Sequence, residues 1–254
     1  MQGIDGVFYL AALWLLQCHV YPRSAFDVNV VGTTNVAEAV METGVKPLAY
    51  SSSASVYGDA LRETMGEDHP LGCGDFYGAS KVCGDVLLCA LHHHSSESDR
   101  RFDFLGLRYM NVYGERQDDK GAYIGVVARM LGCLDAGLHP EIHGDGSQAY
   151  DFVHVRDCAQ ANVCAMASDL TDWMYNVGAG VKTSIATLAQ KLSRLLPVGK
   201  AAVLHPSDRP FVRNRVGSTD LARQEIGITA AIELDAGLRD LMRWRATQLL
   251  EVLS

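Results

Sequence analysis

Pro47-Leu-Ala-Tyr-Ser-Ser-Ser-Ala-Ser-Val-Tyr-Gly58 is the stretch that decides the fold, because an apolar run there passes directly into a run of serines. The apolar residues predict a buried strand over Pro47–Tyr50. The hydroxyl groups that follow then lie at the carboxyl end of the strand, the edge at which open parallel sheets bind their ligands. Taken alone, Ser51, Ser52 and Ser53 are better explained as an ordinary serine-rich turn, so a functional role for them depends on the rest of the sequence.

The rest of the chain alternates short apolar runs with longer stretches of helical period. The predicted strands are Gly6–Leu10, Pro47–Tyr50, Phe102–Leu107, Glu141–His143, Ala149–Val153 and Trp173–Asn176. The predicted helices are Arg23–Glu42, Gly74–His93, Gly121–Ala136, Val155–Ala167, Ser184–Leu195, Ser218–Ile226 and Leu234–Arg245. Buried strands separated by helices are typical of a parallel sheet with right-handed crossovers. The predicted fold class is therefore α/β, a doubly wound, Rossmann-like parallel sheet with a smaller α/β lobe.

Composition excludes several classes of protein. The 254 residues are 48% hydrophobic and carry a formal net charge of −8, which excludes a disordered or collagen-like chain. The acidic balance argues against nucleic acid or an anionic membrane as a partner. Seven cysteines without a Cys-x-x-Cys pair favour reduced thiols and a cytoplasmic location. The apolar run Val7–Leu16 is about half of a membrane span and predicts a buried strand.

Tyr77 and Lys81 form a Tyr-x-x-x-Lys pair near the start of a predicted helix, so both side chains lie on one face. An ammonium about 4 Å from a phenol contributes roughly 4 kcal/mol at an effective dielectric near 20, which lowers the phenol pKa. A phenol tuned in this way can act as general acid or base. The spacing alone also fits a solvated pair on a helix surface.

No metal site is expected from the histidines. His92, His93 and His94 are adjacent in sequence, and adjacent residues do not share a helix face. We interpret them as the solvated end of a helix.

Several motifs occur in a fixed order along the chain. They are Asp5-Gly-Val-Phe-Tyr-Leu-Ala-Ala12, Asn29-Val-Val-Gly-Thr-Thr-Asn35, Ser51 to Gly58, Tyr77-Gly-Ala-Ser-Lys81, Leu107-Arg-Tyr-Met-Asn-Val-Tyr-Gly114, Gly144-Asp-Gly-Ser-Gln148 and Asp151-Phe-Val-His-Val155. As an ordered set they resemble the extended short-chain dehydrogenase/reductase superfamily, specifically its nucleotide-sugar epimerases of the UDP-glucose 4-epimerase type. The resemblance runs from Asp5 to about Arg245.

The resemblance implies a reaction and its participants. Tyr77 would be the catalytic acid/base, Lys81 would bind the nicotinamide ribose and lower the phenol pKa, and Ser53 would hydrogen-bond the reacting oxygen. The implied cofactor is NAD, bound by Leu10, Ala11, Ala12, Asn29, Ser51, Ser52, Tyr77, Lys81 and Tyr109. The implied substrate is a nucleotide sugar, above all a UDP-hexose, bound by Ser53, Asn111, Tyr123, Tyr150, Arg209, Arg213 and Arg215.

The same resemblance implies a domain organisation and an assembly. Residues 1–112 would be the remainder of a dinucleotide-binding domain, which also receives part of 150–178. Residues 113–254 would form mainly the substrate-binding lobe. The implied activity is 4-epimerisation through a transient 4-keto sugar, carried out by a homodimer.

The sequence departs from the family in three places. It contains no Gly-x-x-Gly-x-x-Gly motif, the turn whose amides receive a pyrophosphate, so we expect roughly the first three strands of the family's sheet to be missing and cofactor binding to be weak. Tyr150 stands where many of these epimerases carry an arginine, and Arg209, Arg213 and Arg215 could supply that charge or form a solvated loop. Ala54 and Ser55 replace the Asp-Glu pair of the 4,6-dehydratases, which disfavours dehydration.

Two alternatives follow from these departures. The chain could be a truncated, catalytically silent relative that acts as a sugar-nucleotide binding or assembly module, a reading favoured by the missing glycine motif. It could also be an NAD(P)H-dependent nucleotide-sugar reductase on the same scaffold. The intact set of Ser53, Tyr77 and Lys81 favours an enzyme.

Overall fold

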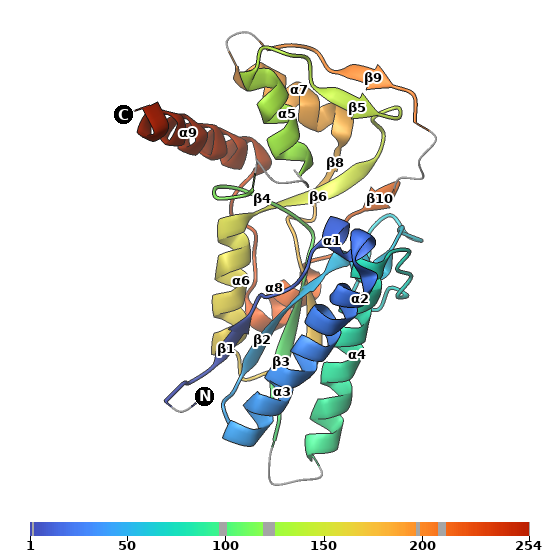
Figure 1. Cartoon of the computed structure of the whole chain (residues 1–254), viewed down its shortest axis with the longest axis vertical. Helices are drawn as coiled ribbons and strands as arrows, with labels where there is room; N and C mark the ends of the chain where they lie inside the picture. The colour runs from blue at the N-terminus through green and yellow to red at the C-terminus, as the bar shows by residue number, and fades with distance from the viewer. Residues whose placement is uncertain (2, 97–100, 119–124, 197–198, 208–211, 254) are drawn as a thin grey trace.

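A four-stranded parallel sheet forms the lower half of the molecule (Figure 1). The structure is a computed structural model that describes residues 1, 3–96, 101–118, 125–196, 199–207 and 212–253. The strand order is β1-β2-β3-β7, with bounds β1 Val7–Tyr9, β2 Leu48–Ser53, β3 Phe104–Tyr109 and β7 Trp173–Val177. All pairings are parallel, so the prediction of a parallel sheet is confirmed.

Helices cover both faces of this sheet. On one face α3 (Gly32–Thr43) and α4 (Phe76–Ser96) lie side by side, in front of and to the right of the sheet in Figure 1. On the other face lie α6 (Val155–Ala167) and α8 (Asp220–Ile226). Each face has its own buried apolar cluster, with Val40 and Leu88 on the α3–α4 side and Ala161 and Ala222 on the other. The doubly wound arrangement is therefore confirmed.

The N-terminal helical region is more broken than the single helix predicted over Arg23–Glu42. It consists of α1 (Leu15–Val20), α2 (Pro22–Ala25), the π-helical segment η1 (Phe26–Val31) and α3. Proline at the first position starts α2, as its fixed φ favours. Helix α1 was not predicted, because its residues belong to the apolar run that also contains β1.

Strand β2 runs through all three serines rather than ending before them. It pairs in register with β3 as far as Ser53 opposite Tyr109. Consecutive side chains of a strand point to opposite faces of the sheet. The serines are therefore divided between the two faces and do not form one continuous turn, contrary to the expectation from the sequence.

A second lobe lies above the sheet in Figure 1. Its strands are β4 (Asn111–Tyr113), β5 (Glu141–His143), β6 (Ala149–His154), β8 (Lys182–Ser184), β9 (Val203–His205) and β10 (Asn214–Arg215). Its helices are α5 (Val126–Asp135), α7 (Ile185–Leu195) and α9 (Leu234–Leu253). The start of the helix predicted over Gly121–Ala136 lies outside the described residues. The division at residue 112 stays a prediction.

The ends of several elements follow from local chemistry. The Ser184 hydroxyl accepts a hydrogen bond from the Thr187 backbone N–H and caps α7, so Ser184 precedes the helix instead of belonging to it. Gly44 and Gly227 take left-handed conformations that end α3 and α8. Among the helices that the structure describes, none is both long and apolar enough to cross a lipid bilayer.

Candidate active site

The candidate site is assembled at the turn after β2, residues 53–58, which we call the serine turn. Ser53 caps the short helix η2 (Ala54–Tyr57), with its Oγ accepting from the Ser55 N–H at 3.1 Å. Helix α4 begins against this turn, since a Cβ added at Gly78 would lie 2.7 Å from the Ser55 carbonyl oxygen. Glycine at this position therefore lets the first turn of α4, which carries Tyr77, approach the serine turn closely.

Lys81 ties α4 to the end of β2. Its Nζ donates a hydrogen bond to the Ser51 carbonyl oxygen at 2.7 Å, and its side chain is almost enclosed. The same nitrogen lies 5.9 Å from the centre of the Tyr77 ring and 5.2 Å from that of Tyr50. Burial lowers the pKa of Lys81 to about 8, against the opposing charge of Asp85. The ammonium is thus held beside the Tyr77 phenol, as the Tyr-x-x-x-Lys spacing predicts.

Asn29 fastens the segment that follows β1 to α4. Its side chain accepts from the Leu13 N–H at 2.7 Å and donates to the Leu13 carbonyl at 2.9 Å. It also donates to Ser80 Oγ at 3.0 Å, and the Ser80 hydroxyl donates to the Tyr77 carbonyl. The interval between β1 and Leu13 is exposed, and it contains Leu10, Ala11 and Ala12. The segment at the carboxyl end of β1 is therefore accessible to solvent.

Gly32, the first residue of α3, faces β1. The atom nearest to a Cβ added there is the Tyr9 hydroxyl oxygen, at 3.4 Å. This is an ordinary van der Waals distance, so the spacing of α3 and β1 does not itself require a glycine here.

The hydroxyl groups of Ser51 and Ser52 point to different partners. Ser51 Oγ donates to the Tyr109 hydroxyl oxygen at 3.5 Å, and Asn162 also donates to that oxygen at 2.7 Å. Burial raises the pKa of Tyr109 to about 12, so this phenol stays neutral. Ser52 Oγ donates to Asp85 at 2.6 Å and is buried on the α4 side. The structure therefore groups Ser51 with Tyr109, and Ser52 with Asp85 of α4.

On the substrate side, Arg215 reaches back to the serine turn. Its guanidinium donates to Ser55 Oγ at 3.4 Å and to the Gly58 carbonyl at 3.2 and 3.3 Å. Tyr150 lies directly opposite Arg215 on the neighbouring strand. The upper lobe thus places a cation against the turn that holds Ser53, with the Tyr150 residue paired to it on the neighbouring strand.

The remaining predicted substrate residues are less close to this group. Asn111 is half-buried in β4, opposite Phe152 of β6. Arg213 is exposed, and its backbone N–H donates to Asp59. Tyr123 and Arg209 lie outside the described residues. The structure accordingly brings Arg215 and Tyr150 together, with Asn111 and Arg213 on the flanking segments.

Three residues of this region were not predicted from the sequence. Asp85 follows Lys81 by one helical turn, and that spacing was the available signal. Ser55 Oγ accepts a hydrogen bond from Arg215, and nothing in the sequence around Ser55 indicated this contact. Asn162 had no assigned role and is now a donor to Tyr109.

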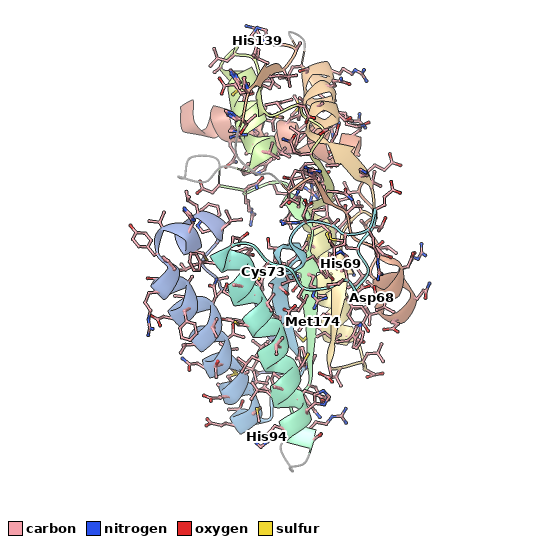
Figure 2. The ribbon with its side chains drawn as sticks, turned by 90° about the vertical axis from the view of Figure 1, so that its right-hand side faces the viewer. Asp68, His69, Cys73, His94, His139 and Met174 are labelled. Atoms are coloured by element: carbon pink, nitrogen blue, oxygen red, sulfur yellow. The ribbon has the colours of Figure 1, made fainter. Side chains whose placement is uncertain are left out.

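A cavity of about 670 Å³ lies apart from these groups, between the end of β4, the start of α6 and Trp244. Ser53, Tyr77 and Lys81 do not line it. The candidate active site is therefore assigned on its side-chain chemistry and its place at the sheet edge. Figure 2 shows the same end of α4 near the loop that carries His69 and Cys73, and His94 at the opposite end.

Comparison with known proteins identifies the family of the chain. Residues 1–178 match the family described as NAD dependent epimerase/dehydratase family. The UDP-glucose 4-epimerase of Mycolicibacterium smegmatis is 36% identical over 232 residues, which are 91% of this chain and 69% of that protein.

Solved structures are similar over almost the whole chain. The UDP-glucose 4-epimerase of Thermotoga maritima with UDP-glucose has a TM-score of 0.89 and 27% identity, covering 96% of this chain and 78% of that one. MoeE5 in complex with UDP-glucose and NAD has a TM-score of 0.87 and 27% identity, covering 97% and 80%. On the sequence match and the shared fold, the chain belongs to the NAD dependent epimerase/dehydratase family of enzymes.

Proposed function

We propose that this protein inverts the C4 configuration of a nucleotide sugar, with UDP-hexoses as the substrate class and NAD as the cofactor. The observation that carries the proposal is the placement of the Lys81 ammonium 5.9 Å from the Tyr77 ring, on the carbonyl of Ser51 two residues before Ser53. A phenol, an amine and an alcohol at the carboxyl end of parallel strands are the groups that a sugar oxidation at a hydroxyl carbon requires.

The residues present fit the nicotinamide end of NAD. Lys81 offers an ammonium donor to a ribose, and Ala11 and Ala12 are small and exposed at the end of β1. Bound NAD would supply the acceptor for a hydride and its return. The pyrophosphate has no matching glycine-rich turn in this sequence, so this chain supplies only part of a dinucleotide site.

Tyr77 moves the proton in this proposal. The phenolate accepts the proton of the sugar 4-hydroxyl as the C4 hydride leaves, and the phenol returns it to the 4-keto oxygen when the hydride comes back on the other face. Lys81 favours the phenolate through its charge. Ser53 donates to the reacting oxygen and holds it in line with Tyr77.

The upper lobe binds the nucleotide in this proposal. Arg215 carries the charge that a diphosphate requires, and a guanidinium matches phosphate oxygens in a fork. Tyr150 and Asn111 add neutral donors. Ala54 and Ser55 follow Ser53 and carry no carboxylic acid, which favours epimerisation over loss of water.

We further propose a cytoplasmic homodimer. Val28 and Val31 of η1 and Val86 of α4 are exposed apolar side chains on the helical layer, and they would be covered by a second copy. Sedimentation velocity measures the state directly, and a strictly monomeric protein at micromolar concentration contradicts this part of the proposal.

The reaction is tested by proton NMR of UDP-glucose and UDP-galactose incubated with the protein and added NAD. Interconversion of the two sugars with no net change in NADH is the expected result. Accumulation of a 4-keto or deoxy product would point to the dehydratases of the family. Stoichiometric consumption of added NADH would instead identify a reductase.

A further inference from the structure

Asp85 sits in an enclosed polar position one helical turn beyond Lys81. Its side chain is 2% exposed. One carboxylate oxygen accepts from Ser52 Oγ at 2.6 Å, and the other accepts from Arg108 Nε at 2.9 Å. Both members of the Arg108–Asp85 ion pair are less than a tenth exposed. Burying such a pair stabilises a fold little compared with apolar residues of similar volume, so the pair calls for another explanation.

The pair is held by a polar row that crosses three strands. Ser52, Arg108 and Asn176 lie opposite one another in β2, β3 and β7. Arg108 also donates to the Tyr57 hydroxyl at 2.9 Å, and that hydroxyl donates to Asn176 Oδ1 at 2.8 Å. Arg108 is therefore fixed from several sides, and it fixes the carboxylate of Asp85 on the face of α4 that carries Lys81.

Lys81 meets few charged groups. Tyr77 and Asp85 face it from its own helix, α4. The Tyr50 ring and the Ser51 carbonyl oxygen face it from β2. The thiol of Cys18 faces it from α1. Burial lowers the pKa of Lys81, and the charge of Asp85 is the largest influence that raises it. Among the described residues, Asp85 is thus the carboxylate that counteracts the cost of enclosing this ammonium.

We propose that Asp85 is a positioning residue whose negative charge, anchored by Arg108 and Ser52, keeps the Lys81 ammonium protonated beside Tyr77. This inference rests on the proposed function, because a protonated Lys81 matters only if Tyr77 exchanges a proton with the substrate. Asp85 touches neither reactant in this account. It acts through Lys81, across one turn of α4.

The test follows the titration of Lys81 itself by NMR of lysine labelled with ¹³C at Cε. The Lys81 signal is assigned by its loss in Lys81→Met. The expected result is that Asp85→Asn lowers the Lys81 midpoint by about 1 pH unit, because a neighbouring charge of opposite sign favours the ionised form by about that amount or more. Asp172→Asn is the matched control, since Asp172 faces His92 and His93 at the far end of α4. It should leave the midpoint unchanged.

An unchanged midpoint in folded Asp85→Asn overturns the inference. Should that single variant fail to fold, Asp85→Asn combined with Arg108→Gln replaces the ion pair by two facing amides, and a smaller downward shift is expected because loss of the Arg108 charge offsets part of the effect. The unmodified protein offers an independent check, since ¹³C carboxyl NMR must find Asp85 ionised at pH 7. A protonated Asp85 at that pH overturns the inference without any substitution.

Together, the Lys81 titration and the activity measurement distinguish a failure of the proposed role of Asp85 from a failure of the proposed function. A shifted Lys81 midpoint in a protein that converts no sugar leaves the electrostatic role standing and removes the proposed function. In an active protein the alkaline limb of the kcat/KM profile should move to lower pH with the Lys81 midpoint. An active protein whose Asp85→Asn variant keeps the parent's alkaline limb contradicts the role of Asp85 alone.

Discussion

Lys81 donates a hydrogen bond from its Nζ to the carbonyl oxygen of Ser51 over 2.7 Å, which joins the helix that carries Tyr77 to the end of the strand that carries Ser53. Strand and helix are separated by a long loop in the sequence. Together with the hydrogen bond from Ser52 to Asp85, this contact fixes the relative position of the two segments on which the proposed chemistry depends.

Replacing Lys81 by methionine should stabilise the fold at neutral pH. The pKa of Lys81 is lowered to about 8 in the fold, below the usual value of about 10.4 in an unfolded chain. The unfolded chain therefore binds the proton more tightly, and the protonated lysine costs the fold about 3 kcal/mol below about pH 8. That cost fades between about pH 8 and pH 10.4.

Urea unfolding of parent and Lys81→Met across this pH range checks that expectation. The difference in the free energy of unfolding should be largest near pH 7 and shrink as the pH rises. A difference that stays constant with pH would mean that the amine titrates normally in the fold.

Gly78→Ala should damage the site through crowding. The added Cβ would lie 2.7 Å from the Ser55 carbonyl oxygen and 2.8 Å from Cys73 Cβ. Relief of such a clash typically costs about 1–3 kcal/mol and moves the start of α4 away from the serine turn. Gly74→Ala is the control, because nothing lies within 4 Å of its added Cβ. We expect turnover and melting temperature to fall in the first variant, and equal effects of the two substitutions would contradict this close approach.

Arg215→Gln should weaken nucleotide-sugar binding. The substitution removes the cation proposed to face the diphosphate, and a charged hydrogen bond is worth about 1.5–3 kcal/mol, so KM should rise about 10- to 100-fold. Arg223→Gln, which removes an exposed arginine paired with Asp220, is the control. Steady-state kinetics of both variants measure the KM for the nucleotide sugar, which should rise in Arg215→Gln and stay unchanged in Arg223→Gln. An unaltered KM in Arg215→Gln would place the diphosphate elsewhere.

NAD should bind this chain weakly when it is added alone. The sequence holds no glycine-rich turn to receive the pyrophosphate, so the contacts to one half of the cofactor are not supplied. Isothermal titration calorimetry of the 254-residue protein is expected to give a dissociation constant above micromolar. Micromolar or tighter binding would contradict the importance of that turn here.

The sequence predicted the parts of the molecule that depend on periodicity. The spacing of Tyr77 and Lys81 placed both on one helix face, and buried apolar runs predicted the parallel sheet. Strands β8 and β10 were not predicted, because their two or three polar residues carry no apolar pattern. They form because β6 offers them a partner.

Long-range pairing explains the other differences. Serines are poor strand formers, yet Ser51–Ser53 are strand residues because β3 supplies hydrogen bonds up to Tyr109. Asp85 lies in α4 and its partners come from β2 and β3, so helix spacing could have suggested its proximity to Lys81 but not its pairing with Arg108. Such contacts exist only in the folded chain.

Turnover by Tyr77→Phe tests the central claim most directly. The phenol is half-buried at the start of α4, so the variant should fold with unchanged circular dichroism while losing the group that exchanges the proton. With UDP-glucose and NAD at saturating concentration, we predict a kcat lower by about 10²- to 10⁴-fold. A folded Tyr77→Phe protein that epimerises the sugar at the parent's rate would contradict the account.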